Sequence, residues 1–257
     1  RLGFNLGANI MYQKHELFGA SVRDLIEKDN WIFNTGAILN SGSETGHRRS
    51  MYSGFGSLQL AFREYLARDL TARNDWSSTL PPSHRSFFYP SANLSFVFSD
   101  FMRSIHHTLP SWITFAKTRF SIAQVGKDPE PYNLYNTRSY RFTSGVRVPV
   151  PQTIKKNANL KPEIKSSLEW GLDMKFLDNR LGFDFTYYTS STKNQAMLVD
   201  ASAPWSQQWV NAGKVNNTGW ELMLYAAPVK TDDFSFDLTT NFAHNRSTVK
   251  ELAPEFN

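Results

Sequence analysis

Residues 168 to 193 carry the feature that most constrains the fold of this chain. Two long runs of alternating apolar and polar residues are joined there by a two-residue turn. A period of two puts alternate side chains on opposite faces of a β-strand. The segment therefore predicts a hairpin with one apolar and one polar face, closed by a type I′ turn at Asp178-Asn179. The apolar parity comprises Leu168, Trp170, Leu172, Met174 and Phe176, and then Leu181, Phe183, Phe185 and Tyr187.

The same alternation recurs along the chain and predicts about nine strands in all. No segment predicts an amphipathic helix of ten or more residues. The fold class is therefore all-β, with antiparallel strands. The remaining predicted strands are residues 1–12, 51–62, 64–76, 91–99, 112–125, 218–227 and 234–245.

Composition narrows the class of all-β protein. Hydrophobic residues make up 40% of the chain and mean hydropathy is -0.44, so no stretch approaches the ~20 apolar residues of a membrane helix. A membrane β-barrel escapes that test because its strands alternate lipid-facing and lumen-facing residues. An aromatic content of 14% predicts interfacial girdles at the two edges of a bilayer.

Charge and cysteine content exclude two further classes. The net charge is +5, but the basic residues are scattered rather than gathered in one stripe, which argues against a nucleic-acid partner. The chain has no cysteine, which rules out disulfide-stapled folds and cysteine-ligated metal sites.

The predicted connections alternate in length along the chain. Short turns fall around residues 63–64, 178–179 and 228–233, with an intermediate one at 100–111. Tight turns on one rim and large loops on the other are typical of outer-membrane barrels, whose short turns are periplasmic. An odd strand count cannot close on itself as antiparallel neighbours, so we expect residues 1–257 to be part of a larger barrel. The long connections are predicted at residues 14–50, 77–90, 126–165 and 194–217.

Several segments resemble the SusC/RagA-like TonB-dependent outer-membrane transporters, in the order and spacing of that family. They are "ARNDWSSTLP" with "RSFFYPSANLSFVFSD", then "FAKTRFSIAQVGKDPEPYNLY", then "NLKPEIKSSLEWGLDMKFLDNRLGFDFTYYTSSTKNQ", and finally "VNAGKVNNTGWELMLYAAPVK". The third segment is quite specific by itself. Together they cover most of residues 51 to 250, whereas residues 1 to 50 match only as a generic strand and loop.

The resemblance implies a 22-stranded barrel in the bacterial outer membrane, plugged by an N-terminal domain. It further implies TonB-energised import of an oligosaccharide or peptide, with a SusD-like surface lipoprotein that captures the substrate. The TonB box, the plug and a last strand with a terminal aromatic are not found in residues 1–257. We therefore expect one partial barrel domain, from the later middle of the barrel, that supplies wall and outer loops.

No enzymatic site, cofactor site or metal site is predicted. Loop carboxylates such as Asp128 and Glu130 lack the spacing of a calcium loop. The run "NLKPE" is expected to be structural because Pro162 restricts its own backbone and that of Lys161. The candidates for contact with substrate or the lid protein are aromatic residues in the predicted long loops: Trp31, Tyr132, Tyr135, Trp205 and Trp209.

Polar residues on the non-lipid parity are expected to hydrogen-bond across the wall or to the plug rather than to line a channel. They are Glu169, Asp173, Lys175, Asp184, Glu221 and Asp237. Six other aromatic residues are expected at the membrane interface or in the wall. They are Trp76, Trp112, Trp170, Trp220, Tyr187 and Tyr188.

Two other functions stay open from the sequence alone. A passive porin-like or anchor barrel would lack a plug encoded upstream. A soluble β-rich carbohydrate-binding module would extract without detergent, but it would not need an apolar band of uniform height.

Overall fold

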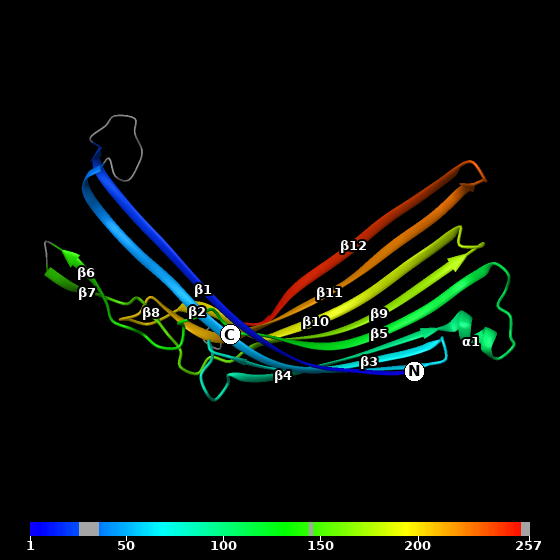
Figure 1. The fold of residues 1–257 in the computed structure, drawn as a ribbon, viewed down its shortest axis with the longest axis horizontal. Helices are drawn as coiled ribbons and strands as arrows, with labels where there is room; N and C mark the ends of the chain where they lie inside the picture. Colours follow the sequence, from blue (N-terminus) through cyan, green and yellow to red (C-terminus); the bar gives the residue numbers. More distant parts are fainter. Residues whose placement is uncertain (26–35, 144–145, 253–257) are drawn as a thin grey trace.

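The computed structural model describes residues 1–25, 36–143 and 146–252, and its main element is one ten-stranded, almost entirely antiparallel sheet (Figure 1). Nine strands follow one another in the order β1-β2-β3-β4-β5-β9-β10-β11-β12, and β8 pairs in parallel with β11. The first part of the sheet comprises β1 (Leu2–Leu25), β2 (Gly36–Phe62), β3 (Leu66–Ser77), β4 (Ser86–Val97) and β5 (Ile113–Lys127). The second comprises β8 (Ile154–Lys155), β9 (Glu163–Phe176), β10 (Leu181–Asp200), β11 (Gln207–Lys230) and β12 (Ser235–Glu251).

Two smaller elements lie in the connections. The helix α1 (Phe98–Ser104) follows β4, and the hairpin of β6 (Ser139–Thr143) and β7 (Val146–Val150) forms a separate two-stranded sheet between β5 and β9. Figure 1 shows the tight turns and α1 at one end of the curved sheet and the long connections at the other. The predicted gathering of tight turns at one end of the sheet is therefore confirmed, whereas the predicted lengths of the connections at the other end are confirmed only in part. None of the helices in the part of the chain that the structure describes is long and apolar enough to cross a membrane.

Strand register puts the predicted apolar residues of different strands on one shared face. One cross-strand row runs through Leu94, Phe120, Trp170, Tyr187 and Trp220, all between 37% and 41% exposed. Because successive side chains of a strand point to opposite faces, the adjacent row lies on the other face. That row is Asn93, Ser121, Glu169, Tyr188 and Gly219. We call the first side the outer face and the second the inner face.

The turn at Asp178-Asn179 has the predicted geometry. Both residues have positive φ, at 55° and 64°, and the Arg180 N–H donates to the Leu177 carbonyl over 3.1 Å. Those two features are the ones expected of a type I′ turn, and Leu177 just before it also has positive φ, at 52°. Phe176 and Leu181 pair immediately beyond it, so the turn sets the register of β9 against β10.

Two predicted long loops are wrong in extent. The structure continues β1 to Leu25 and starts β2 at Gly36, so much of residues 14–50 is paired strand. Likewise β10 and β11 leave only residues 201–206 unpaired between them. Backbone pairing continues there although apolar and polar residues no longer alternate, so the pattern used to detect strands is absent. At about 3.3 Å per residue, the 24 residues of β1 span about 80 Å. A strand of ~9–11 residues is enough to cross a bilayer, so β1 is long enough to extend well beyond one.

The third predicted strand is confirmed, and the fourth ends earlier than predicted. β3 covers most of residues 64–76. β4 ends at Val97, because Phe98 and Ser99 already belong to α1. Pro228 lies within β11 where the register with β12 shifts between Ala226 and Val229, in keeping with the lack of a proline N–H for the ladder.

The β9–β10 turn is open to a direct test. We expect Asn179→Val to destabilise the protein by about 1–2 kcal/mol, since a β-branched residue is strained at positive φ. The same change at Asn241, in the extended β12, is the matched control and should cost little. Unfolding of the purified protein by denaturant measures both variants, and equal losses would contradict the turn assignment.

Candidate functional site

The connection from β5 to β9, which we call the mouth segment (residues 128–162), is held against the long-loop end of the sheet. Its first residue, Asp128, is 2% exposed in its side chain and forms an ion pair with Arg49 of β2. Arg49 Nε donates to Asp128 Oδ2 over 3.0 Å, and the Thr79 hydroxyl donates to the same oxygen over 2.8 Å. The Ser77 hydroxyl also donates to Asp128. A buried carboxylate with four donors ties the mouth segment to strands that are not neighbours of β5.

A small apolar core lies under the mouth segment. Pairing of β4 with β5 ends at Ser91 and Ala123, although both strands continue beyond that point. Leu160, which has no exposed surface, packs there with Leu80 and Phe87, and partly buried Tyr89, Leu134 and Trp209 surround them. Leu160 belongs to the run "NLKPE", whose predicted structural role this packing explains. The mouth segment thus fills the space left by the diverging strands.

Side-chain hydrogen bonds fix the far end of the mouth segment. Asn211 of β11 accepts from the Lys161 N–H over 2.7 Å and donates to the Lys161 carbonyl over 2.9 Å. Lys156 Nζ donates to Asn133 Oδ1 over 2.7 Å, and partial burial lowers the pKa of the Lys156 ammonium. These bonds join Asn133 to Lys156 and hold Lys161 against β11.

Trp209 borders a recess of about 100 Å³ on the inner face, between the mouth segment and the sheet. Lys127, Glu163 and Ala196 share its inner-face parity on β5, β9 and β10, and Glu130 adds a carboxylate from the mouth segment. An indole beside two carboxylates and an ammonium can stack on a ring and hydrogen-bond to hydroxyl or amide groups. This recess is the candidate site for substrate contact.

The predicted aromatic residues do not all meet at one place. Trp209 lies within β11 rather than in a loop, which corrects the sequence-based position, and Trp205 lies half-exposed in the turn of residues 201–206. Tyr132 and Tyr135 lie in the mouth segment with 59% and 62% of their surface exposed. Trp31 lies outside the described residues. Lys127 and Glu163 were missed, although their shared parity with Trp209 could have been read from a correct register.

Tyr132 contacts a second recess, about 280 Å³ in volume, at the β1–β2 hairpin. Its hydroxyl accepts from the Arg48 N–H over 3.0 Å. The rings of His15 and His47 stack there with their centroids 5.1 Å apart. No group of three or more potential metal ligands occurs in the described part of the chain. Tyr132 therefore satisfies a backbone N–H of β2 beyond the point where its pairing with β3 ends.

The inner wall carries a separate charged network near the short turns. Arg119 of β5 extends across Gly171 of β9 and donates to both carboxylate oxygens of Asp184 on β10, over 2.9 and 2.7 Å. It also donates to the Thr186 hydroxyl over 2.6 Å. Asp237 accepts from the Tyr225 hydroxyl over 3.3 Å. These two acids bond across the wall, as expected for residues of the inner parity.

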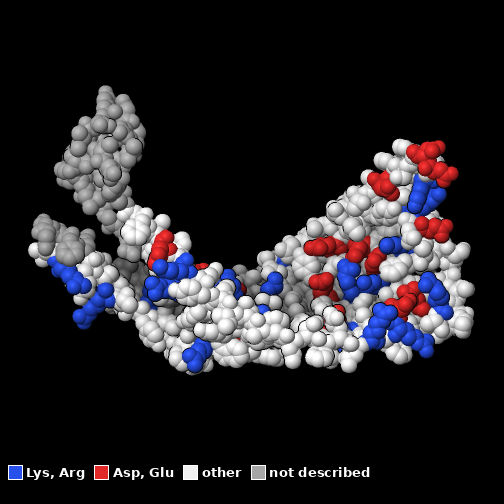
Figure 2. Space-filling model, viewed as in Figure 1, with Lys and Arg blue, Asp and Glu red and all other residues white. Residues whose placement is uncertain are grey.

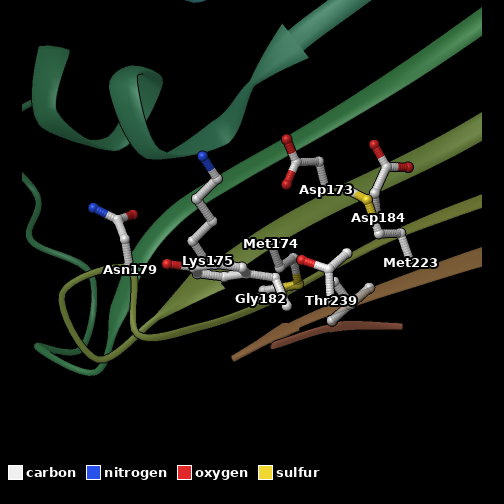
Figure 3. Close-up of a pocket in the computed structure, with 10 residues that line it drawn as sticks. Asp173, Met174, Lys175, Asn179, Gly182, Asp184, Met223 and Thr239 are labelled. Carbon is white, nitrogen blue, oxygen red and sulfur yellow. The ribbon is translucent and has the colours of Figure 1, made fainter. Parts of the chain in front are cut away.

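A pocket of about 360 Å³ lies next to this network (Figure 3). In Figure 3 the carboxylates of Asp173 and Asp184 lie side by side, on the same side of the ribbon as the Lys175 amine. Figure 2 shows acidic and basic side chains interspersed over the concave side of the sheet near its short-turn end. Large uncharged areas lie elsewhere on that view. The inner wall can therefore hold a polar ligand or a polar protein surface.

The chain matches the family model "TonB dependent receptor-like, beta-barrel" over residues 1–255. It is 26% identical to TonB-dependent receptor P3 of Formosa agariphila over 84% of this chain and 22% of that receptor. It is 23% identical to TonB-dependent receptor SusC of Bacteroides thetaiotaomicron over 97% of this chain and 27% of that receptor. The chain thus spans about a quarter of the length of these curated relatives. None of these names denotes an enzyme.

A solved structure titled "Structure of the RagAB peptide transporter" has the same fold. It superposes with a TM-score of 0.84 at 22% identity, over 98% of this chain and 28% of that one. The fold predicted from the alternating segments is therefore confirmed as that of part of a TonB-dependent barrel.

We predict that removal of the Asp128 carboxylate releases the mouth segment from the strands that hold it. We expect Asp128→Ala to cost about 3–5 kcal/mol locally, because Arg49 would keep a partly buried charge without its partner. Hydrogen–deuterium exchange of residues 128–162 should rise sharply. Glu130→Ala, at an exposed position of the same segment, should leave that exchange unchanged. Unchanged exchange in the Asp128 variant would contradict the anchoring role.

The path of Arg119 across residue 171 requires that this residue has no side chain, and this requirement can be tested. A Cβ at residue 171 would overlap the Arg119 side chain, so Gly171→Ala should displace the guanidinium from Asp184. We expect a loss of about 1.5–3 kcal/mol, the scale of hydrogen bonds to charged groups. In an Asp184→Asn background the same change should cost clearly less. A double-mutant cycle of unfolding free energies measures the difference, and strict additivity would refute the coupling.

Proposed function

Because the chain belongs to the TonB-dependent receptor-like β-barrel family and is an outer-membrane protein, we propose that it serves active import of a nutrient energised through TonB. Residues 1–257 supply wall and outer loops of a larger barrel of about 22 strands, and a plug domain fills its lumen. The charged inner wall around Arg119 and Asp184 faces that plug.

The observation that carries this proposal is the two-faced wall. The row from Leu94 to Trp220 offers apolar side chains of similar exposure to lipid, and the row beside it offers polar ones to the lumen. A soluble carbohydrate-binding sandwich would bury such a row against a second layer. Over this sheet, the described residues form no such second layer on the outer face.

The proposed substrate is an oligosaccharide or a peptide, captured under a SusD-like lipoprotein. Two likenesses support this: the sequence match to SusC and the fold shared with the RagAB peptide transporter. The contacts are proposed at Trp209 and Trp205, and at Tyr132 and Tyr135 of the mouth segment. The recess of Trp209, Lys127, Glu130 and Glu163 adds charged partners for hydroxyl or amide groups.

Uptake in cells that carry the intact gene tests the energised mechanism. Accumulation of labelled oligosaccharides or peptides should require both TonB and the proton-motive force. Uptake that persists after deletion of the tonB gene would instead indicate a passive barrel.

The recess is tested in the same cells. We expect Glu130→Gln with Glu163→Gln to raise the half-saturating substrate concentration about tenfold, since about 1.4 kcal/mol of charge-assisted hydrogen bonding corresponds to that factor. Glu64→Gln, at the exposed β2–β3 turn, is the matched control and should have no effect. An unchanged double variant would remove the recess from the substrate path without affecting the TonB result.

A further inference from the structure

Four aromatic rings at the short-turn end, which we call the rim cluster, join three elements on the outer face. The cluster is Phe62, Tyr65, Phe96 and Phe101. The Tyr65 ring lies 5.8 Å from that of Phe62, 6.1 Å from that of Phe96 and 5.3 Å from that of Phe101. Phe62 ends β2, Phe96 is near the end of β4, and Phe101 belongs to α1. The helix therefore packs onto the outer side of the wall.

Strand register shows, independently of the ring contacts, that the rim cluster lies on the outer face. Phe62 and Phe96 both pair with Leu66 of β3, and they share the parity of Leu94. Leu94 belongs to the apolar outer row. Phe101 contacts Phe96, with ring centroids 5.5 Å apart, so this side of α1 continues the outer face.

Large apolar side chains in and next to the rim cluster are exposed. Phe62 is 57% exposed, Phe98 40% and Ile105 43%. Trp112, which is 53% exposed, stacks on Phe176 at the same rim. In a barrel wall these side chains are at the edge of the apolar band, where aromatic residues reside between acyl chains and headgroups.

Three arginines lie in or beside the elements that carry these rings. Arg63 lies with its guanidinium carbon 5.5 Å from the Phe62 ring centroid. Arg68 lies on the outer face of β3 between Leu60 and Leu94, its cross-strand partners. Arg103 of α1 is 76% exposed in its side chain and 3.2 Å from Asp100. Within the described residues, neither Arg63 nor Arg68 has a carboxylate within ion-pair distance.

Arg68 is the most informative of the three. A lipid-facing arginine costs about 2–4 kcal/mol at the bilayer midplane but about 0–1 kcal/mol near an interface. Its place three positions after Tyr65 puts it close to the short-turn rim, so its guanidinium can extend to the headgroup layer. The anion found there is the lipid phosphate, which matches the planar donor fork of arginine.

We propose that Arg63, Arg68 and Arg103 bind the phosphate of a phospholipid in the periplasmic leaflet, with its acyl chains along Phe62 and Phe98. The helix α1 holds Arg103 and Phe98 in this site. The short turns of outer-membrane barrels are periplasmic, which gives the leaflet. The site lies outside the lumen and is independent of the imported substrate.

Native mass spectrometry of the intact protein in detergent tests the site, with phosphatidylglycerol as the added probe. We expect Arg63→Gln with Arg68→Gln to bind the lipid about tenfold more weakly than the parent protein. Arg180→Gln, at the β9–β10 turn of the same rim and away from the rim cluster, is the matched control and should bind normally. Equal lipid binding by the double variant and the parent, or equal losses in the control, would overturn the proposal.

Two further arms identify the source of the phosphate. Inorganic phosphate at the same concentration should not displace the lipid, because it lacks the chains that contact Phe62 and Phe98. Displacement by inorganic phosphate would reduce the site to a simple anion site. Preferential binding of lipopolysaccharide would assign the rim to the other leaflet and overturn the orientation.

Phe98→Trp in the intact protein provides a second readout that does not depend on the arginines. Brominated phospholipid should quench the fluorescence of the introduced indole, whereas Tyr135→Trp in the mouth segment should respond weakly. A Phe98→Trp variant whose added fluorescence is insensitive to brominated lipid would show that α1 lies in water and would also overturn the site.

Discussion

The antiparallel hydrogen-bond ladder is the constraint on which the rest of the structure depends. A chain within hydrocarbon must pair every backbone N–H and C=O with another strand, because no water is present to do so. Pairing fixes register, and register with a period of two fixes the face of every side chain. The apolar row from Leu94 to Trp220 and the polar row beside it follow from that single requirement.

Different interactions stabilise the two ends of the wall. At the short-turn end, tight turns and packed rings such as Tyr65 and Phe101 suit a boundary between lipid and water. At the long-loop end, β4 and β5 diverge beyond Ser91 and Ala123. There the buried carboxylate of Asp128 joins separate elements through hydrogen bonds. Asp128 is suited to this because one carboxylate can accept several hydrogen bonds from separate elements. We therefore expect the functional residues at the long-loop end, where backbone pairing alone does not determine the structure.

The alternation of apolar and polar residues was sufficient to predict strands wherever one face of the sheet contacts lipid. The β9–β10 hairpin, its type I′ turn and the other strands of the wall could be predicted because apolar and polar residues alternate there. The extension of β1 to Leu25 could not, since a hairpin with water on both sides imposes no alternation. For the same reason Trp209 was assigned to a loop, although it lies in β11 beside Glu163 and Lys127.

By itself the sequence determined the strand pattern, the two faces, the tight turn at Asp178-Asn179 and the family resemblance. Each of these depends on residues close together in the chain. Only the tertiary structure decided the partners of Asp128, the passage of Arg119 over Gly171 to Asp184, and the packing of α1 on Tyr65. The physical reason is sequence separation. Arg49 and Asp128 are 79 residues apart, and no local periodicity links two positions that meet only when the sheet curves.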